Sequence, residues 1–307
     1  MYSRILVPLD GSRFSEGVLP YVRALARAVK APVELLYVND PARLAPFSPP
    51  MQGGEYLERV ANSFHGIAAV RCTVELGDPA GMIVDLAAAQ AGTLTAMTTH
   101  GYSGTRRWLL GSVADKVLHA SANHLLLVRP ADGEAAGEAS LKTMLVPLDG
   151  SALAEKIVPI ATELASRLTL EIVLVRVLTR LYFAPPDTIL PLFSQNVLDQ
   201  KELWVQARAE VDEYLASKVE ELHAQGLPHV SSLLLESSAG GAAAEIIDLA
   251  RKTPANLIAM STHGRSGVGR WVLGSVTERV VRYSHDPVLV VRSFDSAHGP
   301  EVLEGPQ

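Results

Sequence analysis

Two short strings, each present twice, contain the residue types that bind phosphorylated ligands. One is ThrHisGly, separated by nine residues from GlySer, at residues 99–112 and again at residues 262–275. Glycine lets the backbone approach a ligand closely, and a helix that starts at GlySer presents unpaired amides and a partial positive charge to a phosphate. Glycine and serine also make ordinary turns and helix caps. The matching second copy favours a phosphate site over that interpretation.

The other string, LeuValProLeuAspGlySer, occupies residues 6–12 and recurs unchanged at residues 145–151. Its aspartates, Asp10 and Asp149, end the first predicted strand of each copy. Each is either a turn or helix-capping residue, or a carboxylate that meets a ribose hydroxyl, a base nitrogen or a magnesium ion. Retention of the whole string in two otherwise diverged copies favours a ligand, although a shared structural turn would also be retained.

Neither string is one of the widespread phosphate loops. No GxxxxGK[ST] pattern is present, and no GxGxxG pattern follows the first predicted strand. These loops supply the phosphate contacts of the common nucleotide hydrolases and the nicotinamide dehydrogenases. Their absence argues against both classes.

The repeated strings divide the chain into two copies. The offset between copies grows from 139 residues at the first string to 163 at the second, so the second copy carries 24 extra residues. These lie within residues 181–226, where a helix is predicted from about residue 197 to residue 225, and could cover a site or an interface. The small, acidic segment 131–140 has the composition of a flexible connection. We therefore expect a first domain at 1–130, a linker at 131–141, a second domain at 142–293 and a disordered tail at 294–307.

Short apolar runs alternate with segments of helical periodicity in both copies, which predicts an α/β fold. Strands that are nearly all apolar imply a parallel sheet covered by helices on both faces, the doubly wound arrangement, whose ligands bind at the carboxyl ends of the strands. Pro20 and Pro159 fall inside the first predicted helix of each copy, so these helices should be kinked or start late. The predicted strands are 4–9, 33–38, 70–76, 94–98 and 124–129, then 143–148, 171–177, 230–235, 256–260 and 287–291.

Composition narrows the setting and the partners. The 307 residues carry a formal net charge of -6 and no run of lysine and arginine, which argues against nucleic acid as a partner. No apolar stretch reaches the roughly 20 residues that cross a bilayer, so no membrane partner is expected. The lone cysteine, Cys72, cannot form an internal disulfide, and the first residues show no signal-peptide pattern. We expect a cytoplasmic protein with Cys72 buried and inert in its strand.

Several further residues match between the copies without forming a catalytic or metal-binding cluster. His100 and His263 follow the fourth predicted strand, but no ligand set accompanies them, so we expect structural or backbone-bonding roles ahead of ligand contact and catalysis. Arg107 and Arg270 either reach a phosphate or stay solvated. Trp108 and Trp271 are expected to pack the loop against the sheet.

Taken together, the two strings resemble the nucleotide-binding branch of the universal stress protein family, in its tandem two-domain form, from residue 4 to 129 and from 143 to 292. The resemblance implies two Rossmann-like five-stranded parallel sheets of order 3-2-1-4-5, with ATP or AMP, with or without Mg, across the strand ends. It also implies that the last strands of the two copies pair edge to edge, which makes an intramolecular pseudo-dimer and leaves a homodimer optional. The implied nucleotide contacts are Pro8, Leu9, Asp10, Val38, Met97, Gly101, Gly111, Ser112 and Val113 in the first copy, and Pro147, Leu148, Asp149, Val177, Met260, Gly264, Gly274, Ser275 and Val276 in the second.

The chain departs from the family pattern at one position of each site. Thr98 and Ser261 stand where the family has the first glycine of GlyxxGly. If that position needs glycine's conformational freedom, the sites are weakened or lost; if not, either hydroxyl can contact the ligand. Ser261 is the smaller intrusion, which favours the second copy.

The leading functional expectation is an adenine-nucleotide-binding protein of the stress response that is not an enzyme, or at most a very slow ATPase, with unknown protein partners. A nucleotide-free tandem scaffold that acts through protein contacts is the alternative. An adenylating enzyme is a third, weaker reading, because no nucleophile and base stand beside the glycine loop.

Overall fold

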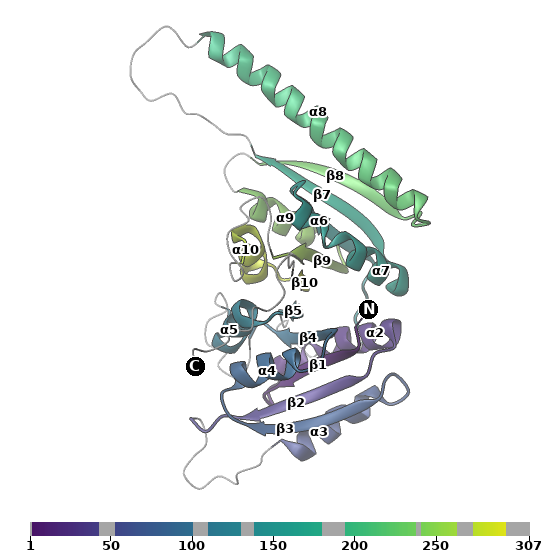
Figure 1. Cartoon of the computed structure of the whole chain (residues 1–307), viewed down its shortest axis with the longest axis vertical. Coiled ribbons are helices and arrows are strands. Elements are labelled where there is room, and N and C mark those ends of the chain that lie inside the picture. The colour runs from purple at the N-terminus through teal and green to yellow at the C-terminus, as the bar shows by residue number, and fades with distance from the viewer. Residues whose placement is uncertain are drawn as a thin grey trace, which may run out of the picture.

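The protein forms one continuous sheet of ten strands, in the order β3-β2-β1-β4-β5-β10-β9-β6-β7-β8. The structure, a computed structural model, describes residues 2–42, 53–100, 110–129, 138–179, 194–237, 241–262 and 273–292, with the backbone alone for residues 194–201. Figure 1 shows the strands stacked along the long axis of the molecule, with β3 and α3 at one end and β8 and α8 at the other. Each half is a parallel sheet of the predicted order 3-2-1-4-5, so the expected pair of doubly wound α/β halves is confirmed.

In the first half, every strand begins within one residue of its predicted start. The strands are β1 (Arg4–Leu9), β2 (Val33–Asn39), β3 (Val70–Leu76), β4 (Thr93–Thr98) and β5 (His124–Val128). The helices are α1 (Arg13–Glu16), α2 (Leu19–Val29), α3 (Gly54–Ala61), the short 3-10 helix η1 (Asn62–Phe64), α4 (Pro79–Ala88) and α5 (Ser112–Ala120).

The second half repeats this order with one much longer helix. Its strands are β6 (Thr143–Pro147), β7 (Glu171–Thr179), β8 (Val230–Ser237), β9 (Asn256–Ser261) and β10 (Val288–Val291). Its helices are α6 (Ala152–Glu155), α7 (Val158–Leu168), α8 (Ser194–Ala224), α9 (Gly241–Lys252) and α10 (Ser275–Tyr283). The segment that carries the extra residues of the second copy contains the predicted helix, α8, which packs against β7 and β8.

The two prolines delay the first long helix in both halves. A single helical turn, α1 or α6, follows the first strand, and the chain then restarts as α2 or α7. Pro20 and Pro159 lie in the first turn of these restarted helices, where a missing amide costs no intrahelical hydrogen bond. The expectation of a late start is confirmed.

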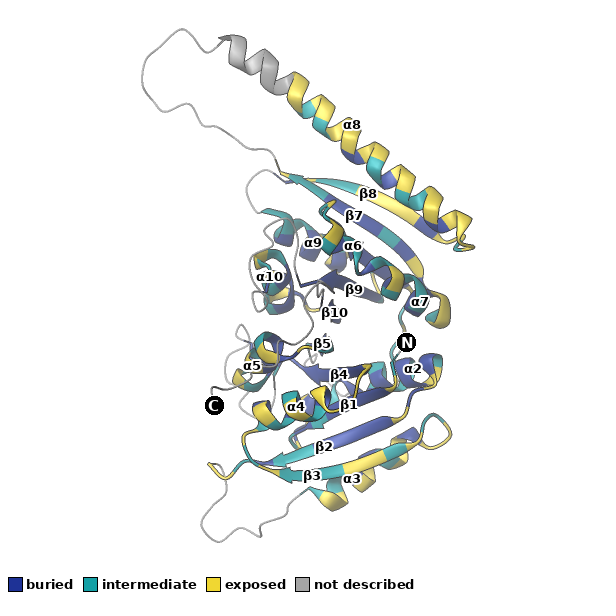
Figure 2. Cartoon of the chain, in the orientation of Figure 1, coloured by how far each residue is buried: buried dark blue, intermediate teal, exposed yellow. Residues whose placement is uncertain are grey.

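Helices cover both faces of the sheet, and the apolar core is correspondingly split in two. One core cluster joins the strands to α2, α3, α7 and α8, and the other joins them to α4, α5, α9 and α10. The inner strands β4, β9 and β10 are buried along their whole length (Figure 2). This double coverage explains why these three strands carry no charged residue.

Cys72 contradicts its expected burial. The side chain is exposed on β3. β3 is the outermost strand of its half, and the helix that packs on it, α3, has only eight residues. The strand also carries Arg71, Thr73 and Glu75, a composition typical of a strand that is covered less than the inner ones. No helix in the described part of the chain is long and apolar enough to span a membrane.

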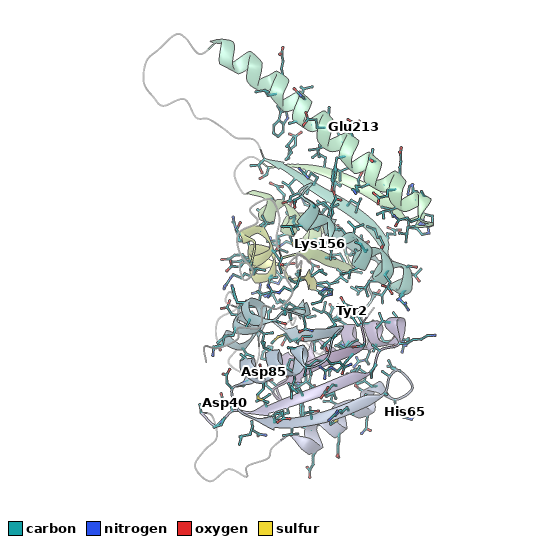
Figure 3. The ribbon with its side chains drawn as sticks, viewed as in Figure 1. Tyr2, Asp40, His65, Asp85, Lys156 and Glu213 are labelled. Carbon is teal, nitrogen blue, oxygen red and sulfur yellow. The ribbon has the colours of Figure 1, made fainter. Side chains whose placement is uncertain are left out.

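The two halves meet through their last strands, which confirms the intramolecular pseudo-dimer. β5 and β10 pair antiparallel, with Leu126 opposite Leu289. Beside this pairing, the Tyr2 hydroxyl lies 3.1 Å from Nδ1 of His124, and the two rings meet edge to face at 5.7 Å. Figure 3 places Tyr2 at the level where the halves join. Burial lowers the pKa of His124 to about 4.

The lowered pKa of His124 predicts a pH-dependent loss of stability. The histidine stays neutral in the fold but takes up a proton near pH 6.5 once unfolded, so its contribution is present above pH 6.5 and is lost as the pH falls toward 4. The free energy of unfolding should fall by up to about 1.4 kcal/mol per pH unit from this group in that window. Urea titrations from pH 4 to 7 check this by comparing the wild type with His124→Asn. Equal slopes in the two proteins would contradict it.

Candidate functional site

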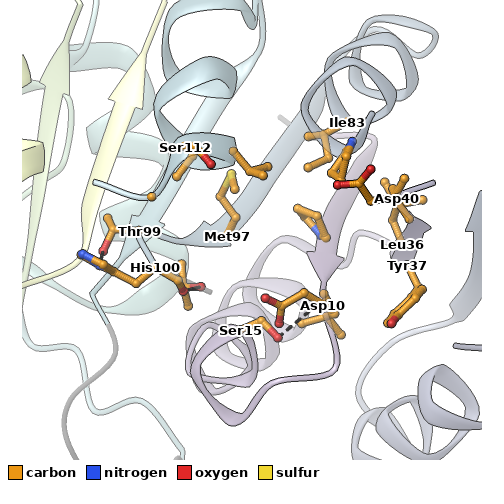
Figure 4. Close-up of a pocket in the computed structure, with 18 of the residues that line it drawn as sticks. Asp10, Ser15, Leu36, Tyr37, Asp40, Ile83, Met97, Thr99, His100 and Ser112 are labelled. Carbon is orange, nitrogen blue, oxygen red and sulfur yellow. Dashed lines mark hydrogen bonds between the residues drawn. The ribbon is translucent and has the colours of Figure 1, made fainter. Parts of the chain in front are cut away.

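A cavity of about 460 Å3 lies at the carboxyl ends of β1, β2 and β4 in the first half. Its floor is made by residues that end these strands, among them Pro8, Val38 and Met97, and its sides by the starts of α4 and α5. Figure 4 shows Met97 and Ser112 at one side of the cavity, Asp10 beside Ser15, and Asp40 toward Ile83. Strand ends that converge at one edge of a parallel sheet are where doubly wound folds bind ligands.

The turn between β1 and α1, at the edge of the cavity, is held by hydrogen bonds from its own side chains. Asp10 Oδ1 accepts hydrogen bonds from the Ser12 amide at 3.0 Å and the Ser12 hydroxyl at 2.6 Å. The Ser12 hydroxyl in turn accepts from the Ser15 amide at 3.1 Å and caps α1. Gly11 has a φ of +80°, a backbone angle that residues other than glycine rarely adopt. The turn interpretation of this string is therefore correct for Oδ1, and the same carboxylate also lines the cavity.

The second string closes a loop whose two ends are hydrogen-bonded together. The Thr99 amide donates to the Val128 carbonyl at 2.9 Å, and the Gly111 amide donates to the Thr99 carbonyl at 2.8 Å. A Cβ atom on Gly111 would lie 3.1 Å from that carbonyl, so a side chain there requires the loop to shift. Glycine is needed for close approach at this position rather than for its backbone angles, since its φ is -62°.

Helix α5 begins at the cavity. Gly111 is its N-cap and supplies no side-chain hydrogen bond to the first turn. Ser112, Val113 and Ala114 all line the cavity, so the amides of the first turn and the Ser112 hydroxyl are placed beside it. These amides have no partner within the helix, and together with the helix dipole they stabilise an anion by typically 0.3–1 kcal/mol, or about 2 kcal/mol where partly buried.

The second half reproduces this construction around a smaller cavity of about 280 Å3. Asp149 Oδ1 accepts from the Ser151 amide at 2.9 Å and the Ser151 hydroxyl at 2.6 Å. The Thr262 amide donates to the Val291 carbonyl at 3.0 Å, and the Gly274 amide to the Thr262 carbonyl at 2.7 Å. We call the two cavities site 1, at Asp10, and site 2, at Asp149. The sizes favour site 1, opposite to the sequence argument from Ser261.

Thr98 and Ser261 occupy the last positions of regular strands. Thr98 pairs with Val128 in the β4–β5 register, and Ser261 pairs with Val291 in the β9–β10 register. Neither has a positive φ. The Thr98 hydroxyl donates to the His100 carbonyl at 2.7 Å and so stabilises the start of the loop. Glycine's conformational freedom is not required at this position, which removes the strain expected from the departure.

The structure brings the expected contact residues together in both halves. Site 1 is lined by Pro8, Leu9, Asp10, Val38, Met97, Gly111, Ser112 and Val113. Site 2 is lined by Pro147, Leu148, Asp149, Val177, Met260, Gly274, Ser275 and Val276. Some expected residues lie outside the described residues, namely Gly101, Gly264, His263, Arg107, Arg270, Trp108, Trp271 and the tail 294–307. That the lining residues contact a nucleotide stays a prediction.

Sequence reasoning missed lining residues that come from other elements. Asn39 is the last residue of β2 and Asp40 follows it, so the rule that ligands bind at strand ends could have identified both. Pro79 and Ile83 come from α4, whose first turn reaches the cavity from beyond β3. His100 also lines site 1, and its Nδ1 lies 3.0 Å from the Thr99 hydroxyl. The sequence does not show that α4 packs beside the ends of β1, β2 and β4, so its lining residues could be found only from the fold.

The described lining of site 1 is acidic. Its carboxylates are Asp10 and Asp40, and no lysine or arginine is among its described lining residues. No group of three or more metal-binding side chains occurs in the described part of the chain. Magnesium usually takes one or two carboxylates together with phosphate oxygens and water. The two aspartates of the described lining therefore fit a magnesium ion that arrives with a nucleotide, and are too few to hold a metal by protein alone.

Comparisons with known proteins identify the fold and the family. The sequence profile of the universal stress protein family matches residues 1–129 and 140–292. The chain belongs to the universal stress protein family. A universal stress protein of Mycolicibacterium smegmatis is 26% identical over 308 residues, which cover 94% of this chain and 96% of that protein.

Two solved structures share the tandem fold of this family member. A functionally unknown protein from Pseudomonas aeruginosa PAO1 is 14% identical, with a TM-score of 0.68 over 95% of this chain and 93% of that chain. A universal stress protein from Archaeoglobus fulgidus is 20% identical, with a TM-score of 0.62 over 96% of this chain and all (100%) of that chain. At these identities the likeness establishes the fold.

The strand geometry of Thr98 predicts that restoring glycine destabilises the protein. Thr98→Gly removes the hydroxyl bond to His100 and adds backbone freedom to the unfolded chain, which together should lower the free energy of unfolding by about 2 kcal/mol. Thr98→Ser keeps the hydroxyl and should lose less. Urea denaturation of the three proteins measures the difference. A Thr98→Gly protein as stable as the wild type would show that the position is strained after all.

Proposed function

We propose that the protein is a non-catalytic adenine-nucleotide-binding protein of the stress response, at most a very slow ATPase, and that nucleotide occupancy alters its shape or its protein partners. The observation that carries the proposal is the construction of site 1. An apolar floor, an aspartate turn and a helix start free of a side-chain cap converge on one cavity. These are the surfaces that a purine, a ribose and a phosphate respectively require.

The parts of site 1 suggest how a nucleotide lies. Val38, Ile83 and Met97 offer apolar surface to the base, and Asp10 lies nearer the chain turn at the end of β1. The first turn of α5 at Ser112 would hold the phosphates, and the Asp10 carboxylate would hold either the ribose or a magnesium ion that neutralises the phosphate charge. Site 2 offers the same arrangement in a smaller volume, so we propose that it binds the same ligand more weakly. A cytoplasmic setting and an optional homodimer are part of the proposal.

Calorimetric titration with ATP, AMP and cyclic AMP, in the presence of magnesium, tests this function. The wild type should bind ATP at two sites of unequal affinity. Gly111→Leu should remove the tighter site, because any side chain at 111 approaches the Thr99 carbonyl and the cavity, and Gly274→Leu should remove the weaker one. The two variants serve as controls for each other.

The absence of saturable binding at millimolar nucleotide would overturn the proposal in favour of a nucleotide-free scaffold. Mass spectrometry of ligands released from gently purified protein gives an independent readout. Stoichiometric ATP in that sample would exclude the scaffold.

A further inference from the structure

The last residue of each terminal strand is followed by an arginine whose side chain crosses to the other half of the molecule. Arg129 follows β5, and its Nη1 donates to the Arg282 carbonyl in the last turn of α10 at 3.2 Å. Arg292 follows β10, and its Nη2 donates to the Leu118 carbonyl in the last turn of α5. The two contacts are reciprocal, because each arginine binds the helix that starts at the other half's site. Figure 1 shows α10 above and α5 below the level at which β5 and β10 meet, and both helices pack on the same core cluster.

From these contacts we infer that Arg292 is a positioning residue for site 1 and Arg129 for site 2. The helix that starts at each nucleotide site is held in place by an arginine of the opposite half. The ligand in this statement rests on the proposed function, whereas the crossing of the arginines rests on the contacts alone. Neither arginine is among the described lining residues of site 1 or site 2. Each acts through the helix whose far end meets the ligand.

The physical basis is the unsatisfied carbonyls at the end of a helix. The last four carbonyls of α5 have no intrahelical donor, and a cation near them interacts favourably with the helix dipole. Arg292 is only 9% exposed, so water has little access to this contact, and the guanidinium supplies the hydrogen bond that the Leu118 carbonyl would otherwise lack. Burial lowers the pKa of Arg292 to about 10, which leaves it charged at neutral pH. Arg292 thereby fixes α5 at one end, while an anion would bind at the other.

A second contact between the halves acts on the opposite end of α5. Asp115 lies in the first turn of α5, where its negative charge disfavours an anionic ligand at the adjacent helix start. Nη2 of Arg282 in α10 lies 2.8 Å from Asp115 Oδ1 and offsets this charge. Arg282 also pairs with Glu278 of its own helix at 3.0 Å. The second half therefore supports both ends of the helix that opens site 1.

The backbone links each arginine to its own half's site as well. Val128 and Val291, which precede the two arginines, accept the amides of Thr99 and Thr262 at the start of each site loop. Each strand end is therefore bonded through its backbone to one site loop and through the following side chain to the other site helix. A merely structural arginine would support its own half and the opposite half alike; a positioning arginine affects the opposite site.

Single-site backgrounds separate these two roles. In a Gly274→Leu background, which leaves site 1, Arg292→Met should weaken ATP binding about tenfold, as expected for loss of a charged hydrogen bond, and Arg129→Met should change it less than about twofold. In a Gly111→Leu background, which leaves site 2, the two effects should exchange. Arg292→Lys should restore most of the affinity, because lysine still donates to the Leu118 carbonyl. Calorimetry measures all four combinations.

Hydrogen exchange in the ligand-free wild-type background decides the inference even if no nucleotide binds. Arg292→Met should speed amide exchange in residues 110–121, which contain α5, and leave residues 273–284 unchanged; Arg129→Met should do the reverse. Absence of ATP binding in the wild type would refute the proposed function, whereas this exchange pattern would still support the crossed positioning. Faster exchange confined to each arginine's own half, or equal in both helices, would overturn the inference.

Discussion

The antiparallel pairing of β5 with β10 is the constraint on which the rest of the architecture depends. Three residue pairs centred on Leu126 and Leu289 join two five-stranded parallel sheets into one sheet of ten strands. The pairing satisfies the backbone groups of both terminal strands, which would otherwise be exposed edges. It also brings α5 and α10, the helices that start at the two sites, to the same junction. The arginines after these strands can then contact the opposite helix.

The two sites retain the contacts that shape the backbone and differ in the side chains around them. The aspartate turn and the bond between the glycine amide and the threonine carbonyl have the same geometry in both halves. The surroundings have changed: Ser15 of site 1 corresponds to Ala154 of site 2, and the polar Asp40 at the end of β2 corresponds to Thr179. A single substitution in the aspartate turn or at the glycine would disrupt the backbone of the site, whereas a side chain of the lining can change without disturbing the others. The two cavities have therefore diverged in size and polarity on one scaffold.

The two halves also differ in the contact between the second strand and the helix that packs behind the aspartate turn. In the first half, Tyr37 packs edge to face against Tyr56 of α3. In the second half, the guanidinium of Arg176 lies over the ring of Tyr214 of α8, 5.6 Å from its centroid. The Tyr214 hydroxyl donates to Glu155 at 2.8 Å, which ties the long helix α8 to the turn of α6 beside site 2. The long helix of the second copy is thus anchored beside the site by the half-buried Tyr214 and by Lys218, whose Nζ lies 2.9 Å from Glu155 Oε2.

The sequence by itself determined the repeated unit, the ten strands and the late start of α2 and α7, because these follow from local patterns: apolar runs, helical periodicity, and a proline that cannot sit inside a helix. It also placed Asp10, Asp149 and the two ThrHisGly strings at strand ends, because a parallel sheet gathers these ends at one edge, although Asn39 and Asp40 at the end of β2 were missed. The tertiary structure alone decided what depends on neighbours distant in the chain. Cys72 is exposed because β3 is an edge strand under a short helix, Thr98 is unstrained because it ends a paired strand, and Arg292 reaches Leu118 because β10 lies beside β5. No local pattern in the sequence indicates these three features, so only the packed fold reveals them.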